Sequence, residues 1–553
     1  MTYAEILMRK GKRGAAAYVQ AECNSSNAGE PSRKEPQHLN ALLDYLLDPD
    51  KDINNQDTID WCRWLVGGGT SYEDFSQNVR QYDNTALCGL VWTADFVAFR
   101  CRTCGISQCM SLCNECFKQH RTNHQGHDFN MFKSQAGGAC DCGDSSVMKE
   151  SGFCSQHHGQ RRVPPPEPSQ DLMCVAENIM PRIILRLLQH LRINSVPSKP
   201  TMTAAEALEK YEEVIRNCDR FLNLLEDFTS LGSAMRTVMT QCLTDGESYQ
   251  RYTNVSEDSE YANFMRRSKE LYEDALASLP NPDPPREFQD CPALTAELHH
   301  RTFLEEIVFW TVKYEFPEKL VCLLLKILPD TKYKEAFTRS FVLHYSRVSM
   351  MLVRSSNSDK LSNRIVHVSV QLFSNKDLAL AMTEQLSLLH IMVSSLKNMM
   401  NDVLISSGLH HDSDQNKHKV VDCAKHVMRH HCYWPLVSDL HNVLCHPPIA
   451  FRFMADNSLL TMWFDFIKMF QGMNLNIRIS GQHIEFEPNT YYASFSGELE
   501  AAASILWAMV SHLRDNSNNA REFSANVIRH CLRAILEWME AISYRSPELV
   551  SSG

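Results

Sequence analysis

The sequence predicts a small, metal-stabilised zinc module with little regular structure, followed by a mainly α-helical region that packs its helices in a solenoid-like array. Two observations predict this fold class. Nine of the twenty cysteines lie between Cys88 and Cys154, in a window that also contains several histidines. Beyond residue 170, apolar residues recur with a helical period, and the β-branched alternation typical of strands is nearly absent.

Length and composition set the broad class of the protein. A chain of 553 residues is too long for one core, and its length predicts roughly three to four domains. The net charge of -11 opposes a general nucleic-acid binder, and no apolar run reaches the ~18 residues that a membrane span needs. The charged N-terminus, Met1 to Gly14, does not resemble a signal peptide. We therefore expect a cytoplasmic protein, with the nucleus also open to it, and neither nucleic acid nor membrane as a partner.

The chain divides into four segments by composition. Residues 24–37 are polar, and Leu39, Leu42, Leu43, Leu46 and Leu47 then follow at helical spacing. Pro164, Pro165 and Pro166 indicate a stiff linker after the cysteine-rich window. The predicted segments are a helical and partly flexible N-terminal segment (1–85), the zinc module (86–158), a Pro-rich linker (159–171) and an all-α scaffold (172–553).

Helical periodicity in the scaffold is interrupted by polar or Pro-rich breaks. A short pair of strands is expected around residues 476–487, NIRISGQHIEFE. No repeat of fixed length is visible, so the sequence supports no named repeat class. The predicted helical ranges are 172–193, 203–243, 302–327, 361–405, 416–433, 493–514 and 520–543.

The zinc module contains eleven well-spaced thiol and imidazole donors, several of them in pairs with the two-residue gap that lets both side chains reach one tetrahedral ion. Closed structural sites take four ligands each, so two ions would leave three donors idle and three ions need twelve positions. The twelfth position is filled either by a bridging thiolate or by Cys109, and His120 is left as a spare. The donors are Cys88, Cys101, Cys104, Cys113, Cys116, His124, His127, Cys140, Cys142, Cys154 and His157.

Closed sites have no open position for water or substrate, so three structural zinc ions and no catalytic residue are expected. The function must then lie on the surface that the metal organises. Asp141 and Asp144 alternate with the ligand Cys142 in Gly-Gly-Ala-Cys-Asp-Cys-Gly-Asp, residues 137–144. Two carboxylates on a rigid turn make a preorganised acceptor for a cation or an amine. The alternative is that both aspartates cap turns or accept amides of the loop itself.

The donor order together with the CDCGD core resembles a UBR box, the zinc domain of the N-recognin family of E3 ubiquitin ligases. The surrounding residues, CRTCGISQCMSLC and HDFNMFKSQAGGACDCGD, are most similar to the third member of that family. The resemblance implies three ligand sets in which Cys116 bridges two ions and Cys109 is not used. These sets are Cys101, Cys104, His124 and His127; Cys88, Cys113, Cys116 and Cys140; and Cys116, Cys142, Cys154 and His157.

The resemblance also implies that Asp141 and Asp144 bind the α-amino group and the basic side chain of a substrate's N-terminal residue. Relatives that bind basic N-termini carry a third acidic residue where this chain has Ser107, and an aromatic residue where it has Ala139. Charge-assisted hydrogen bonds contribute on the order of 1.5–3 kcal/mol each, so the loss of one carboxylate predicts weak or altered recognition of Arg and Lys N-termini. The expected partners are protein substrates with N-terminal or internal degrons.

Ligases of this family transfer ubiquitin through a RING domain, and no RING-like pairing of cysteines follows residue 158. We therefore expect this chain to be the substrate-recognition part of a RING-type ligase, not catalytic alone, and to engage an E2 ubiquitin-conjugating enzyme only through a region absent here. The alternative is a zinc-stabilised protein-interaction scaffold without N-terminus recognition.

Overall fold

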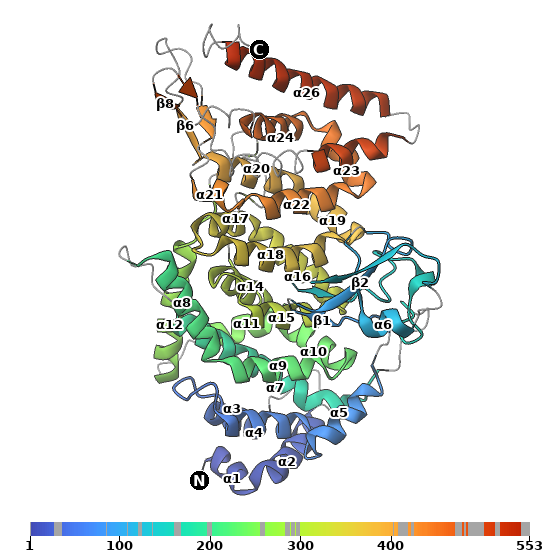
Figure 1. Ribbon diagram of the computed structural model, residues 1–553. Helices are drawn as coiled ribbons and strands as arrows, with labels where there is room; N and C mark the ends of the chain where they lie inside the picture. The colour runs from blue at the N-terminus through green and yellow to red at the C-terminus, as the bar shows by residue number, and fades with distance from the viewer. Residues whose placement is uncertain are drawn as a thin grey trace. The chain divides into compact units, whose positions relative to one another are not determined.

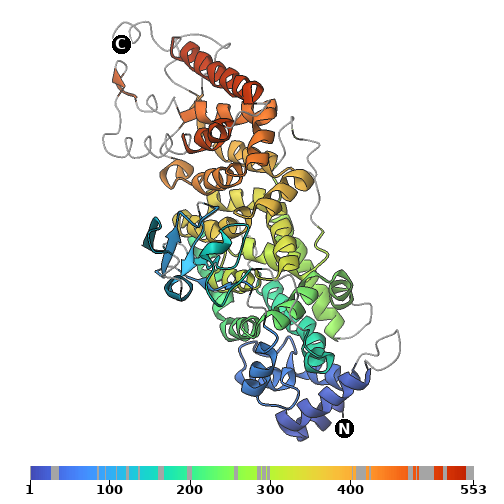
Figure 2. The same ribbon diagram turned by 90° about the vertical axis from the view of Figure 1, so that its right-hand side faces the viewer.

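The computed structural model is largely helical, with a small group of strands near its first third (Figures 1 and 2). Clustering of contacts divides the chain into two compact units. The first is Met1–Pro280 with Leu298–Phe341, and the second is Asn281–Glu297 with Val342–Gly553. The structure describes residues 2–26, 36–83, 86–93, 95–107, 109–119, 124–134, 137–159, 167–195, 202–254, 260–282, 288, 294, 299–401, 403–406, 419–421, 425–470, 478–480, 483–484, 503–514 and 520–543.

The first unit begins with helices that have well-formed N-caps. The Thr2 side chain accepts from the Glu5 backbone and Glu5 bonds back to Thr2, which is a capping box. Asn55 and Ser71 cap two later helices in the same way, through side-chain oxygens. The helices of this segment are α1 (Tyr3–Arg9), α2 (Gly11–Ser26), α3 (Gln37–Leu46), α4 (Gln56–Val66) and α5 (Tyr72–Arg80).

Helix α7 (Gln170–Ile193) is the central element of the first unit. It packs against α2, α4, α10, α12 and α14, and its apolar residues Ile179, Ile183 and Leu187 are fully buried. Burial of such side chains is worth about 1.5–3 kcal/mol each, which makes α7 the core of the unit. The other helices are α8 (Ala204–Arg216), α9 (Asp219–Thr229), α10 (Ser233–Thr244), α11 (Gly246–Thr253), α12 (Glu260–Ala277), α14 (Phe303–Lys313), α15 (Glu318–Lys326) and α16 (Thr331–Leu343), whose C-terminal end passes into the second unit.

The second unit stacks short helices against their neighbours: α17 contacts α20, α18 contacts α22, and α24 contacts both α20 and α26. Among the described residues no single helix is long and apolar enough to cross a membrane, although the bent pair Lys376–Leu386 and Leu388–Met400 passes on length and composition. The helices are α17 (Tyr345–Arg354), α18 (Ser358–Phe373), α19 (Lys376–Leu386), α20 (Leu388–Asn401), α21 (His426–Arg429), α22 (Trp434–Leu444), α23 (Pro447–Ala455), α24 (Asn457–Phe470), residues 503–511 and α26 (Ala520–Ser543).

The predicted helical character of the scaffold is confirmed, but several predicted ranges need correction. The range 203–243 divides into α8, α9 and α10, and the range 361–405 contains α18, α19 and α20. The range 302–327 is broken between α14 and α15, where Glu315 and Phe316 take φ values of 57° and 54° before Pro317. The ranges 361–405 and 416–433 were also too long. Their facing ends, Leu404–Ser406 (β6) and Lys419–Val421 (β7), pair as antiparallel strands, in which the β-branched residues Ile405, Val420 and Val421 favour extended backbone. The strand pair expected at 476–487 is present as β8 (Arg478–Ser480) and β9 (His483–Ile484).

Asp439 of α22 is a buried acid in the second unit. It accepts hydrogen bonds from the Tyr345 hydroxyl at 2.8 Å and from the Ser369 hydroxyl at 2.6 Å. Burial raises the pKa of Asp439 to about 7, even though the two hydroxyls favour the ionised form. An acid with a raised folded pKa destabilises the fold as pH rises from its unfolded value of about 4 towards 7, by about 1.4 kcal/mol per unit.

We therefore expect the Asp439 carboxyl to lower the urea midpoint of the second unit at pH 8 relative to pH 5, and Asp439→Asn to remove this contribution to the pH difference. Asp377→Asn, on the exposed start of α19, is the matched control and should leave it unchanged. Urea unfolding of the three proteins at both pH values measures the effect. A pH difference that persists fully in Asp439→Asn contradicts the assignment.

Candidate metal centre and substrate site

The zinc module is built from short strands that end at its metal-binding residues. Strand β2 (Val97–Cys101) lies between β3 (Leu112–Cys113) and β4 (Phe129–Lys133) in an antiparallel sheet, and β1 (Val91–Trp92) pairs with β5 (Gly138–Ala139) (Figure 1). Cys101 and Cys113 are the last residues of β2 and β3, Cys116 lies in the short helix α6 (Asn114–Gln119), and Cys140 follows β5. The ladders therefore set the spacing of the donors.

The interior of the module consists mainly of cysteines and a few aromatic and apolar side chains. Phe117 stacks on Phe99 at 4.1 Å between ring centroids and on His124 at 4.9 Å, which orients the His124 ring. So few large apolar residues cannot stabilise a domain of this size alone, and structural zinc sites contribute folding free energy directly. The module is therefore expected to depend on metal.

Three groups of four donors come together, and within each group the ligand atoms lie within 4.8 Å of one another. They divide the eleven predicted donors as the family resemblance implied, with Cys116 shared by two groups. Cys109 belongs to none of the three groups, and His120 lies outside the described residues. The groups are Cys88, Cys113, Cys116 and Cys140; Cys101, Cys104, His124 and His127; and Cys116, Cys142, Cys154 and His157.

Backbone N–H groups donate hydrogen bonds to several of these sulfurs, which favours their thiolate form. The Cys113 N–H donates to Cys140 Sγ at 3.2 Å, and the Cys154 N–H donates to Cys142 Sγ at 3.2 Å. A hydrogen bond with the adjacent Cys116 thiol lowers the pKa of Cys142 to about 5. Hydrogen bonds with the thiols that surround Cys116, that of Cys113 above all, raise the pKa of Cys116 well above its usual range. A coordinated divalent cation would let all of these neighbouring thiols ionise together, because a metal-bound thiol is deprotonated outright. Tetrahedral sets of thiolate and imidazole donors fit Zn²⁺.

The turn that carries the two aspartates requires glycine. Gly143 has φ +98°, and a Cβ there would meet the Ala86 carbonyl oxygen at 1.9 Å. The Cys88 N–H donates to the Cys142 carbonyl at 2.9 Å, so the turn is held against the start of the module. Asp141 and Asp144 consequently lie before and after Gly143 in one fixed turn, which the Asp144 N–H closes by donating to the Asp141 carbonyl at 3.0 Å.

The two aspartates have different surroundings. Asp141 Oδ2 accepts the Ser111 N–H at 2.7 Å, and burial raises the pKa of Asp141 to about 7 against this hydrogen bond. Asp144 Oδ1 accepts both the N–H and the hydroxyl of Ser146, at 2.9 and 2.6 Å. Asp144 Oδ2 lies 3.6 Å from the Nζ of Lys334, a residue of helix α16 in the same unit.

Ser107 lies beside the same turn. The N–H groups of Ile106 and Ser107 both donate to the Val147 carbonyl, at 2.9 and 3.0 Å, while the Val147 N–H donates to the Asp144 carbonyl at 3.3 Å. The Ser107 hydroxyl accepts the Cys109 N–H at 3.2 Å. The structure thus brings the three predicted substrate-site residues to one loop cluster. The motif analysis missed Ser111 and Lys334, because neither belongs to a spacing pattern and Lys334 is far from the module in sequence.

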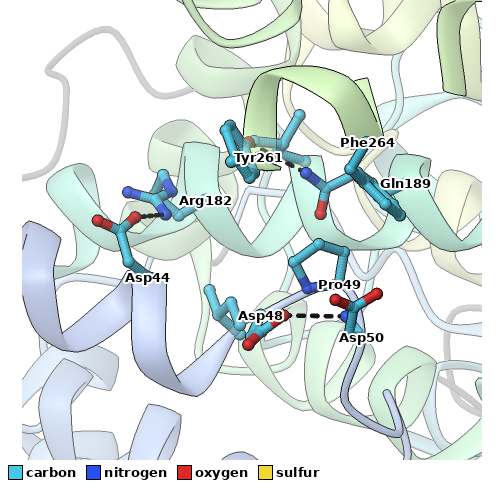
Figure 3. Close-up of a pocket in the computed structure, with 10 residues that line it drawn as sticks. Asp44, Asp48, Pro49, Asp50, Arg182, Gln189, Tyr261 and Phe264 are labelled. Atoms are coloured by element: carbon cyan, nitrogen blue, oxygen red, sulfur yellow. Dashed lines mark hydrogen bonds and ion pairs between the residues drawn. The ribbon is translucent and has the colours of Figure 1, made fainter. Parts of the chain in front are cut away.

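A separate cavity of about 390 Å³ lies in the first unit, beside α3, α7 and α12 (Figure 3). Arg182 is paired with Asp44 on its rim, and the Gln189 side-chain amide donates to the Tyr261 hydroxyl at 3.1 Å. Its lining contains neither cysteine nor histidine, so it offers no thiol or imidazole for metal binding or nucleophilic chemistry.

Comparisons with known proteins match both parts of the chain. Residues 87–157 match the putative zinc finger in N-recognin (UBR box), and residues 274–547 match the UBR1/2/3-like ARM repeat domain. The second match corrects the sequence-based conclusion that no named repeat class is supported. ARM repeats vary in length and in residue identity, so a search for one fixed period does not reveal them.

Three relatives illustrate the similarity over the whole chain. The E3 ubiquitin-protein ligase Ubr3 of Drosophila melanogaster is 48% identical over 98% of this chain and 23% of its own length. The human E3 ubiquitin-protein ligase UBR3 is 42% identical over 88% of this chain and 28% of its own length, and the human UBR2 ligase is 21% identical over 86% and 28%. The chain thus spans about a quarter of the length of these relatives. With its UBR box and its UBR1/2/3-like ARM domain, the chain belongs to the UBR-box N-recognin family of E3 ubiquitin-protein ligases.

Proposed function

We propose that this chain recognises degrons, including free protein N-termini, for a RING-type ubiquitin ligase of the N-degron type. The observation that carries the proposal is the fixed turn on which Asp141 and Asp144 lie beside three groups of four thiol and imidazole donors. We propose three structural zinc ions, with the Cys116 thiolate bridging two of them. Zinc would hold the loops in place, and the chain's own carboxylates would bind the substrate.

Ubiquitin transfer would need a RING region and an E2 that these 553 residues do not supply. We propose a cytoplasmic location, with the nucleus also open to the protein.

We propose that the chain has a weak or altered preference for N-termini with basic side chains. Ser107 stands at the position where relatives that bind basic residues carry a carboxylate, and a hydroxyl cannot pair with a second positive charge as an anion does. An α-ammonium group would therefore be recognised mainly by the aspartates. The side chain of the first residue would contribute less than it does at a three-carboxylate site.

One observation favours a second candidate, a zinc-stabilised interaction scaffold. Asp141 and Asp144 both accept hydrogen bonds from their own module, from Ser111 and Ser146. Aspartates that only satisfy loop amides would give the module its shape without binding an N-terminus.

Peptide titration separates the two candidates. The zinc-loaded full chain is titrated by fluorescence anisotropy with one peptide sequence that has either a free or an acetylated N-terminus. A free N-terminus should bind at least about ten-fold more tightly, because one charge-assisted hydrogen bond is worth about 1.5–3 kcal/mol. Asp141→Asn should abolish this difference while keeping the side chain's shape and its bond to Ser111.

Asp128→Asn is the matched control, since Asp128 is an exposed acid of the same module whose carboxylate pairs with exposed Arg102. It should bind both peptides as the unmodified chain does. Equal affinity for free and acetylated peptides would overturn N-terminus recognition and leave the scaffold function.

A further inference from the structure

Helix α16 presents a lysine to the aspartate turn of the zinc module. Lys334 lies in the first turn of α16, and its Nζ is 3.6 Å from Asp144 Oδ2. The side chains of Lys334 and Asp144 are only 16% and 22% exposed, so the pair is largely shielded from solvent. Shielding strengthens the interaction between opposite charges, because less water and salt screens it.

The contact is part of a close docking between the module and α15–α16. Strand β1 lies against α15 (Figure 1). Gly89 has φ +59°, and a Cβ on it would meet Pro329 Cγ at 2.3 Å, so the turn that precedes α16 touches the module backbone. Bulkier residues at Gly89 would separate these surfaces.

Asp330 fixes the start of α16 and hence the position of Lys334. Its Oδ1 accepts the Tyr333 N–H at 3.0 Å, its Oδ2 accepts the Thr237 hydroxyl at 3.3 Å, and its carbonyl accepts the Lys334 N–H at 2.9 Å. The lysine backbone is therefore anchored by a capped helix, which aims the side chain at the turn.

The four carboxylate oxygens of Asp141 and Asp144 thus differ in their partners. Asp144 uses Oδ1 for Ser146 and has Lys334 beside Oδ2, while Asp141 uses Oδ2 for Ser111. Among the described residues, Asp141 Oδ1 has no hydrogen-bond partner, which leaves one carboxylate oxygen for an incoming ammonium. The Lys334–Asp144 distance exceeds the 2.7–2.9 Å of a direct charge-assisted hydrogen bond, so Lys334 neutralises Asp144 without closing the turn.

We infer that Lys334 is a specificity-determining residue of the substrate site: a cation supplied by the chain itself, which leaves room for one α-ammonium group and selects against a basic N-terminal side chain. The inference rests on the proposed function. It adds a second reason for weak recognition of basic N-termini, a lysine that lies outside the zinc module. An N-terminal Arg or Lys brings a second positive charge towards a carboxylate that Lys334 already neutralises. N-terminal residues with uncharged or acidic side chains bring no such charge and are the substrates that this arrangement favours.

The test compares Lys334→Gln with the unmodified full chain, using free-N-terminus peptides that start with Arg, Ala or Glu. Lys334→Gln should raise the affinity for the Arg peptide relative to the Ala peptide by about ten-fold, as expected for one unpaired carboxylate regained. Lys334→Arg should keep the original ratio. Lys332→Gln, an exposed lysine on the same helix, is the matched control and should not change it.

A second measurement does not depend on peptide binding. Brief acetylation of the peptide-free chain, read by mass spectrometry, should modify Lys334 several-fold more slowly than Lys332, and Asp144→Asn should speed the reaction at Lys334 alone. Equal rates at the two lysines would overturn the inference.

The outcomes separate the inference from the proposed function. If the unmodified chain binds free N-termini and Lys334→Gln leaves the Arg-to-Ala ratio unchanged, Lys334 does not determine specificity and the proposed function stands. If only Lys334→Gln binds the Arg peptide, both are supported. If neither protein distinguishes free from acetylated peptides, the proposed function fails, and the specificity role fails with it.

Discussion

Replacing Cys116 by serine is expected to remove two of the three proposed zinc ions at once. The Cys116 sulfur belongs to two of the three donor groups, whereas every other donor belongs to one. A serine hydroxyl is a poor ligand for Zn²⁺, so both groups drop to three donors. Binding of a structural zinc ion is worth about 10–16 kcal/mol in small zinc domains at pH 7, which makes this the largest effect that we expect from any single side chain.

Zinc content of the purified chain, measured by inductively coupled plasma mass spectrometry, tests this prediction. The unmodified chain should hold three equivalents and Cys116→Ser close to one, with hydrogen exchange showing loss of protection in β2 to β4. Cys104→Ser should remove one equivalent only, because Cys104 serves the single group with Cys101, His124 and His127.

Cys109→Ser is the matched control, since Cys109 is a partly buried cysteine of the same module and belongs to none of the donor groups. It should retain all three equivalents. The sequence left open whether a bridging thiolate or Cys109 fills the twelfth position. Zinc loss in Cys109→Ser without a double loss in Cys116→Ser would show that the bridged assignment is wrong and that Cys109 is the twelfth donor.

The donor pairs could be predicted because local spacing encodes them, whereas their division into three ligand sets came from the family resemblance. Cys101 and Cys104, or Cys113 and Cys116, lie within one turn of chain, so a tight turn brings both sulfurs to one ion whatever the rest of the protein does. Helical periodicity likewise predicted most of the scaffold. It failed at Leu404–Ser406 and Lys419–Val421, because short apolar segments do not distinguish a helix end from a strand.

Contacts between distant segments were not predictable in this way. Lys334 reaches Asp144 only because Gly89 lets the turn at Pro329 approach the module and Asp330 caps α16. None of these residues forms a motif, and each would be ordinary in another context. The proposed substrate site thus has one part, the aspartate turn, that the sequence motif indicates, and a second part, Lys334, that only the packed structure brings beside it.

Removing the carboxylate of Glu306 is the second large effect that we expect. Glu306 of α14 is fully buried and accepts four hydrogen bonds: from Arg192 Nε at 2.6 Å, Arg192 Nη2 at 2.7 Å, the Tyr249 hydroxyl at 2.6 Å and the Trp310 indole N–H at 3.0 Å. Glu306→Ala leaves the Arg192 guanidinium buried without its anion, which costs about 3–5 kcal/mol. Hydrogen exchange should accordingly become faster in α7 and α14, since α14 packs on α7 in the first unit.

The pH dependence of this pair has a definite sign. Burial acts against the charge, but Arg192 and the other donors lower the pKa of Glu306 below its usual value. A depressed pKa contributes stability that is present above the unfolded value of about 4.3 and is lost as the pH falls through the folded value. Glu306→Gln should lack this acid-sensitive component.

Glu384→Ala, at an exposed pair with Arg452, is the matched control for Glu306→Ala and should cost no more than about 1 kcal/mol. Comparable destabilisation by Glu306→Ala and Glu384→Ala would mean that the buried pair contributes no more than a surface one.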